Sequence, residues 1–149
     1  MGISYDVFIG EFLSKVTERD LLSLDRDERD DIVIGYMKRS ISGFKKNCKY
    51  DLIGTMDDEI RMFHVEIPEN DLNEIADIVS EGMIVQWLKP YVYRQELLEN
   101  AINTRDFTTY SPAELLMRVG NAYREAKKDY TQMMREYSFN NGDLSDLHL

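Results

Sequence analysis

Apolar side chains recur every three to four residues along most of this chain, which is the period of an α-helix with one buried face. The pattern predicts a short amphipathic helix near the N-terminus and a second helix over residues 29–46. The inward positions of the first helix are Tyr5, Ile9, Phe12, Leu13 and Val16. Those of the second helix are Val33, Met37, Ile41 and Phe44. Between them, residues 17–31 are rich in Asp, Glu and Arg and are expected to form a solvated connection.

A third helix is predicted from about residue 70 to residue 88, where apolar residues occupy nearly every face. We expect it to be the central and most buried helix. Pro90 should either kink it or separate it from a further helical piece over residues 91–102, because proline lacks a backbone donor and clashes with the preceding turn. Before this helix, the helical period is lost over residues 50–68, and the alternation around Phe63 predicts a short β-hairpin.

The last helix has the clearest start signal in the chain. Ser111 is placed as the N-cap, Pro112 as the first helical residue, and Glu114 can reach back to the cap. Behind them runs a heptad seam, in which apolar side chains alternate at spacings of three and four. Its members are Leu116, Val119, Tyr123, Ala126, Tyr130, Met133 and Tyr137. Such a seam needs a facing surface, and two interpretations stay open: the chain's own core or a neighbouring subunit.

We name Tyr123, Tyr130 and Met133 as candidate subunit-interface residues. Beyond the seam, residues 138–149 place spaced apolar side chains on a polar segment, which suits lying along a partner more than forming a core. The predicted partner-binding residues are Tyr137, Phe139, Leu144, Leu147 and His148. The sequence therefore predicts a helical domain over residues 1–137 and a C-terminal docking arm over residues 138–149.

The predicted fold class is mainly α: a single-domain bundle of four to five helices with a short irregular or β-hairpin excursion and an extended C-terminal arm. A length of 149 residues fits one core. The net charge of −10 argues against gripping nucleic acid, because phosphate binding relies on clustered Lys and Arg, but an acidic surface lets DNA pass without sticking. A single cysteine excludes an internal disulfide and indicates an intracellular setting. The sequence also lacks a membrane span of roughly 18 to 20 apolar residues.

Residue types that carry chemistry are sparse and scattered. His64 and His148 each lack a second histidine nearby in the sequence, so a metal or acid/base site would need distant carboxylates. Cys48 lies among three lysines, a setting that lowers a thiol pKa, although an ordinary surface thiol is the simpler interpretation. The acidic run over residues 25–31 lacks the register of a calcium loop, and the sequence has no phosphate loop, nucleophile elbow or dinucleotide fingerprint. We predict no catalytic residue, no metal and no cofactor.

Three stretches of the C-terminal half carry a resemblance to one family. They are residues 77–90 (DIVSEGMIVQWLKP), residues 106–116 (DFTTYSPAELL) and residues 142–148 (GDLSDLH). These stretches look like the head–tail connector, or adaptor, proteins of tailed bacteriophages, which are small structural proteins that sit beneath the portal. The resemblance covers about half of the chain and rests on general similarity, not on a catalytic signature.

The resemblance implies a small helical protein that forms a ring, commonly of twelve copies, in the virion neck between head and tail. Its C-terminal arm would reach up to the portal protein, and its lower face would receive the stopper or tail-completion protein. DNA would pass through the ring without sequence-specific binding, and assembly would take place in the host cytoplasm. Two other classes stay open: an acidic helical regulatory protein, such as an inhibitor or DNA mimic, and a small enzyme with converging titratable groups.

Overall fold

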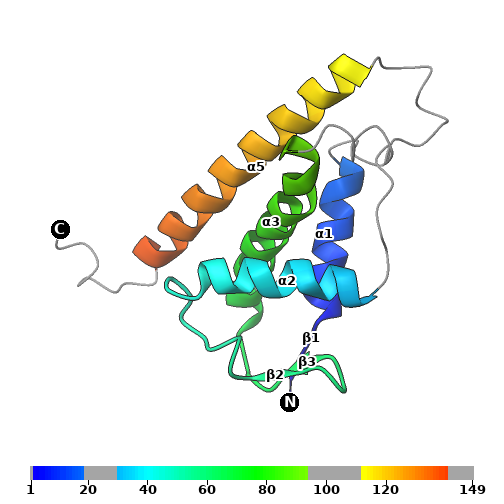
Figure 1. Ribbon diagram of the computed structural model, residues 1–149. Coiled ribbons are helices and arrows are strands. Elements are labelled where there is room, and N and C mark those ends of the chain that lie inside the picture. Colours follow the sequence, from blue (N-terminus) through cyan, green and yellow to red (C-terminus); the bar gives the residue numbers. More distant parts are fainter. Residues whose placement is uncertain (1, 19–29, 94–111, 141–149) are drawn as a thin grey trace.

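Figure 1 shows a computed structural model of the protein, which describes residues 2–18, 30–93 and 112–140. The described chain contains the four helices α1 (Asp6–Glu18), α2 (Asp30–Phe44), α3 (Glu69–Tyr93) and α5 (Pro112–Asn140). The first, second and last of these pack against α3, and a small sheet lies at the end of the body where α1 begins. The prediction of a mainly α fold with a short β excursion is confirmed. None of these helices is long and apolar enough to cross a membrane.

The central position of α3 follows from its sequence. Twelve of its 25 residues are buried, including every residue from Ile78 to Val85. A helix that is apolar on all sides has to be covered on all sides, so its neighbours must surround it. Trp87 is 1% exposed and meets Phe12 of α1 edge-on, with the ring centroids 5.9 Å apart. The prediction of a central, most buried helix is confirmed, and α3 continues through Pro90, so the proline does not end it.

A buried ion pair fixes α1 against α3. Lys15 Nζ lies 3.1 Å from Glu81 Oε1 and 2.6 Å from Asp77 Oδ1, and it also donates a hydrogen bond to the Asp77 carbonyl oxygen. The Lys15 and Glu81 side chains are only 8% and 2% exposed. A charge removed from water is costly unless an opposite charge meets it, so this contact restricts how α1 can sit on α3.

The β excursion is a three-stranded antiparallel sheet and not a lone hairpin. β2 (Met56–Asp57) and β3 (Met62–Phe63) pair with each other, as the sequence predicts. β1 (Ile3–Ser4) adds a third strand along the other edge of β3. The sequence did not predict this strand, because Ile3 and Ser4 come directly before the apolar period of α1 and lie in no alternating stretch.

Aromatic packing ties the sheet to the helices. Phe63 is fully buried, and its ring meets those of Tyr5 and Phe8 at centroid distances of 4.8 Å and 5.4 Å. The Tyr5 hydroxyl donates a 2.7 Å hydrogen bond to Asp58, which also accepts one from Lys38 of α2. An isolated pair of short strands is only marginally stable in water. The sheet therefore depends on these contacts with the helices for its stability.

The heptad seam of α5 lies against the chain's own body. Tyr123 is 6% exposed, Tyr137 is fully buried, and Tyr130 donates a 2.5 Å hydrogen bond to the Ser40 carbonyl oxygen of α2. Gly82 of α3 makes this close approach possible, because a Cβ there would lie 2.1 Å from Ser40 Oγ and 2.7 Å from the Tyr130 ring. The helix continues to Asn140, three residues into the stretch that the sequence assigns to the arm.

The two N-terminal helices are also confirmed, and all four inward positions predicted for α2 are buried. In α1, Phe8 is fully buried although the sequence pattern did not select it, whereas Ile9 and Leu13 are half-buried. Several expectations fall outside the described residues: most of the solvated connection, the helical piece beyond Tyr93 and the Ser111 cap.

Candidate functional site

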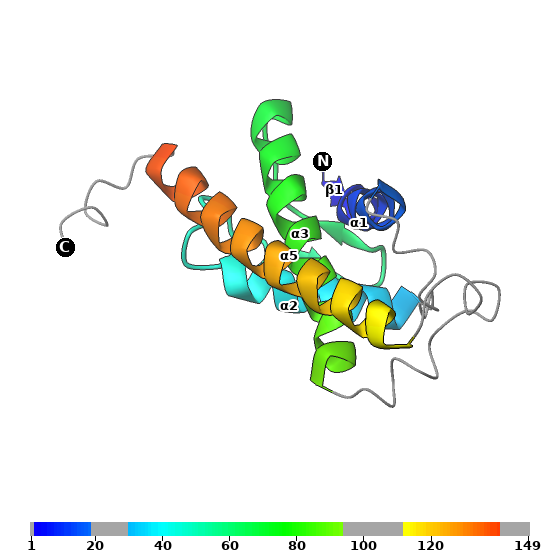
Figure 2. The ribbon, with the colours of Figure 1, turned by 90° about the horizontal axis from the view of Figure 1, so that it is seen from above.

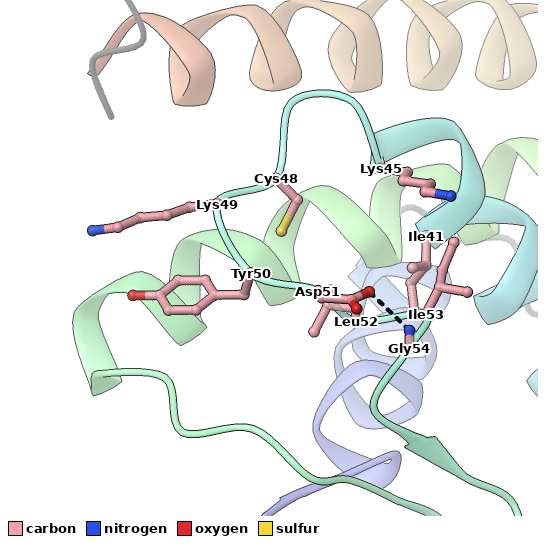
Figure 3. A pocket seen from close by; sticks show the side chains of 9 residues that line it. All are labelled: Ile41, Lys45, Cys48, Lys49, Tyr50, Asp51, Leu52, Ile53 and Gly54. Atoms are coloured by element: carbon pink, nitrogen blue, oxygen red, sulfur yellow. Dashed lines mark hydrogen bonds between the residues drawn. The ribbon is translucent and has the colours of Figure 1, made fainter.

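A pocket of about 460 Å³ opens beside the C-terminal end of α2 (Figure 3). Ile41 of α2 and Lys45 just beyond it line one part, and the loop over residues 48–54 lines the rest. Figure 3 shows Lys45 and Lys49 on opposite sides, with the Cys48 thiol between them. The site therefore combines an apolar interior with two cationic side chains at its rim.

Local hydrogen bonds give the loop its shape. The backbone N–H groups of Asn47 and Cys48 both donate to the Phe44 carbonyl oxygen at 3.0 Å, which closes the last turn of α2. Further on, the Gly54 N–H donates to Asp51 Oδ1 at 2.8 Å, the dashed line in Figure 3. A Cβ on Gly54 would lie 2.2 Å from the Asp51 carboxylate, so a larger residue at this position would displace the Asp51 side chain that shapes the turn.

Three contacts hold the loop to the rest of the body. The Tyr50 hydroxyl donates a 2.7 Å hydrogen bond to Asp71 at the start of α3. The Lys49 N–H donates to the Tyr137 hydroxyl of α5 at 3.3 Å. Leu52 is 2% exposed and anchors the middle of the loop in the core. Because α3 and α5 both hold it, the pocket is formed before any ligand arrives.

The charge of the pocket is opposite in sign to that of the protein as a whole. Lys45 and Lys49 are exposed, and neither makes an ion pair with any residue that the structure describes. Lys49 lies over the Tyr50 ring at 5.8 Å, and the Asp51 carboxylate is engaged by the Gly54 N–H. In a chain of net charge −10, this arrangement favours a ligand that combines an acidic group with an apolar one.

The structure argues against the activated-thiol alternative for Cys48, which the sequence left as the less simple interpretation. Burial raises the pKa of Cys48, and this outweighs hydrogen bonds from the Tyr50 backbone and the Tyr137 hydroxyl that lower it. The neighbouring lysines suggested the opposite sign from the sequence, but their charged ends lie in solvent while the thiol is partly enclosed. A thiol of raised pKa is a poor nucleophile at neutral pH.

His64 lies at the exposed sheet, where its Nε2 is 2.9 Å from Asp57 Oδ2. This contact lowers the pKa of the Asp57 carboxyl. Among the described residues, no group of three His, Cys, Asp or Glu side chains is placed to hold a metal ion.

The partner-binding residues predicted from the sequence divide into three cases. Tyr137 is fully buried against Phe44, with the ring centroids 5.1 Å apart, so its ring is part of the core. A direct contact between this ring and a partner would require it to leave that position. Phe139, by contrast, is 66% exposed near the end of α5. Leu144, Leu147 and His148 lie outside the described residues, and their role stays a prediction.

The candidate subunit-interface residues Tyr123, Tyr130 and Met133 all pack against the chain's own core. Within one chain, these three side chains therefore pack as the intramolecular interpretation of the seam predicts. Tyr123 meets Tyr93 of α3 at a centroid distance of 6.5 Å, and Tyr130 reaches α2 through its hydroxyl. Whether copies of the chain also meet along this helix stays a prediction.

A scan against protein-family models and searches of curated proteins and of solved structures found no match to this chain. The pocket itself was not predicted from the sequence. The sequence feature closest to a signal for this pocket is the group Lys45, Lys49 and Cys48. In the sequence alone, this group suggests only a setting for a reactive thiol. The contact between the loop and Tyr137 joins residues 88 positions apart, and no local pattern reveals such a contact.

Proposed function

We propose that this chain is a structural virion protein, a head–tail connector (adaptor) that forms a ring beneath the portal and joins it to the stopper or tail. The observation that carries the proposal is the geometry of α5. This helix is fixed to the body along one stripe, and Figures 1 and 2 show its C-terminal end at the outer edge of the molecule. The exposed Phe139 lies there, within residues 138–149, the segment predicted to dock. Such a helix would hold the start of a C-terminal arm in a fixed position relative to the body.

The charge distribution also supports assembly from identical copies. α5 carries five basic and four acidic residues, although the whole chain has a net charge of −10. The rest of the molecule is therefore more acidic than this helix, so α5 repels the acidic surface of a neighbouring copy less than other parts of the molecule would. A contact between two different faces of one protein is heterologous, and it closes into a ring where the rotation permits.

The choice of a virion connector ring, and not another kind of ring, rests on the resemblance over residues 77–90, 106–116 and 142–148. In that proposal the portal protein and the stopper are the partners, and the acidic surface lines a channel through which DNA slides. No catalytic group is required for this role.

The test is to image assembled phage particles that contain the protein by electron cryomicroscopy. We expect multiple symmetry-related copies in the neck, each with α5 directed so that its C-terminal segment meets the portal. Absence of the protein from the neck, or its presence there as one asymmetric copy, would contradict the proposal.

Solution mass separates this function from the main alternative. A connector should form a complex of high mass when portal is added, even if the isolated chain is monomeric. The net charge of −10 also suits an acidic inhibitor or DNA mimic. A protein of that class would remain a monomer or dimer with portal and would instead bind a basic partner.

A further inference from the structure

The two lysines at the pocket rim call for an occupant of a particular composition. Lys45 and Lys49 flank an apolar interior that includes Ile41, and Ile53 at the pocket is 37% exposed. An occupant should bring apolar side chains for the interior and carboxylates for the rim. The volume of about 460 Å³ holds a few side chains and not a folded domain.

The chain's own C-terminal segment has this composition. Asp143 and Asp146 alternate with Leu144 and Leu147. The spacing of three within each pair means that one helical turn would present both leucines on one side and both aspartates on an adjacent side. Charge and apolar character thus match the pocket in kind.

The segment also begins within reach of the pocket. Tyr137 in the last turns of α5 contacts Lys49, a residue of the pocket wall, with 3.3 Å between the hydroxyl oxygen and the backbone nitrogen. Leu144 lies four positions beyond Asn140, the end of α5. An extended chain spans at most about 3.6 Å per residue, so Leu144 can lie roughly 14 Å from the helix end.

We propose that the pocket beside α2 binds residues 143–147 of the same chain, with Leu144 and Leu147 in the interior and the two aspartates paired with Lys45 and Lys49. The segment is thereby held against the body in the isolated protein. In the connector proposed above, the same residues would have to leave the pocket before they could dock elsewhere. The intramolecular contact itself does not depend on that function.

Cys48 provides a native probe of the pocket. Its thiol lies between the two lysines, and a bound segment would shield it (Figure 3). The experiment is to measure the rate at which N-ethylmaleimide modifies Cys48 in the full-length protein. The pH should be about 8.5, because burial raises the pKa of this thiol. If the segment is bound about four-fifths of the time, releasing it should speed modification roughly fivefold.

Four full-length variants, compared with the parent chain, make the comparison independent of direct charge effects on the thiol. The D143K/D146K variant should react roughly fivefold faster than the parent chain, with the pocket unchanged. The K45D/K49D variant should also lose protection. Combining all four substitutions restores opposite charges, so this protein should react more slowly than K45D/K49D, with which it shares the pocket. A matched L144S/L147S variant keeps every charge and should react as fast as D143K/D146K.

The proposal fails if the D143K/D146K and L144S/L147S variants react at the parent rate. It also fails if the four-substitution protein is no slower than K45D/K49D. Protection that increases with protein concentration would show that the segment binds a second copy, which overturns the intramolecular contact. None of these measurements involves the portal, so their outcome is separate from that of the connector proposal.

Discussion

α3 and α5 are the two longest helices of the described chain, and they meet their surroundings in opposite ways. α3 is mostly buried between Ile75 and Leu88, and the other three helices pack against it. α5 buries only its seam and carries charged residues on the opposite side. A helix covered on most sides defines the body, whereas a helix held along one stripe keeps a long face, from one end to the other, that no other described helix covers. Met117 and Phe139, near those two ends, are each 66% exposed.

This difference predicts where substitutions cost stability. Changes at the twelve buried residues of α3 should destabilise the protein, because their side chains are closely packed. Changes on the outer face of α5 should leave the fold intact and act on contacts with other molecules.

The largest expected effect is at the ion pair between α1 and α3. Lys15→Met removes the positive charge and leaves Glu81 buried at 2% exposure. We expect the free energy of unfolding to fall by roughly 3–5 kcal/mol, the range observed when one partner of a buried pair is removed. Urea denaturation of the variant and the parent protein measures this.

The matched double variant Lys15→Met/Glu81→Met identifies the cause. It removes both charges, so much of the lost stability should return. If the free energy of unfolding of the single variant falls by less than about 1 kcal/mol, water must reach the Glu81 carboxylate. In that case α3 would be less enclosed than the structure shows.

A smaller loss is expected where α2, α3 and α5 meet. A Cβ at Gly82 would lie 2.1 Å from Ser40 Oγ, so Gly82→Ala must displace Ser40 or Tyr130. Overpacking of this kind costs roughly 1–3 kcal/mol. Gly10→Ala in α1 is the control, because no atom lies within 4 Å of its added Cβ. That variant should be more stable by roughly 0.5–1 kcal/mol, since alanine favours helix. Equal effects in thermal melts of the two variants would contradict this.

The helices were predictable because their signals are local. The period of Val33, Met37 and Ile41, and the apolar surface of α3 around Ile78, appear within one or two turns. What the sequence could not show are contacts between distant segments. β1 has only two residues, and its pairing with β3 joins positions about sixty residues apart, Ile3 with Phe63. Nothing in the sequence near Ile3 specifies that partner.

The same limit applies to the candidate site. The lysines around Cys48 were visible in the sequence, but the sign of the thiol pKa shift depends on burial, which only the packed structure gives. The seam of α5 was also visible, yet its period does not tell an intramolecular surface from a neighbouring subunit. The 2.5 Å hydrogen bond from Tyr130 to Ser40 places this side chain in the body.

Tyr130→Phe tests whether the Tyr130 hydroxyl bonds within one chain, and the expected effect on stability is moderate. The substitution removes only the hydroxyl, so the loss should be about 0.5–1.5 kcal/mol, the usual contribution of one hydrogen bond. The loss should be the same at low and high protein concentration, as monitored by denaturation over a hundredfold dilution series. A loss that grows with concentration would instead place Tyr130 between subunits.

The smallest effect is expected at Glu136, an exposed residue of α5 whose charge acts on Glu74 of α3. Burial, together with the nearby charges of Asp71 and Glu136, raises the pKa of the Glu74 carboxyl on α3 above its ordinary value of 4.5. A raised carboxyl pKa in the folded state means that the folded protein binds the proton more tightly than the unfolded chain. Glu74 therefore favours folding at pH values below 4.5, and this contribution is lost as the pH rises through the folded-state pKa.

Glu136→Lys replaces a repulsive charge beside Glu74 with an attractive one. The variant should be more stable than the parent at pH 7 by less than about 1 kcal/mol, because both groups are largely in contact with water. The gain should shrink at pH 3, where Glu74 is mostly protonated in either protein. Following Glu74 by NMR titration should show its pKa falling in the variant. A gain that is as large at pH 3 as at pH 7 would mean that packing of the lysine stem, and not the charge of α5, stabilises the contact with α3.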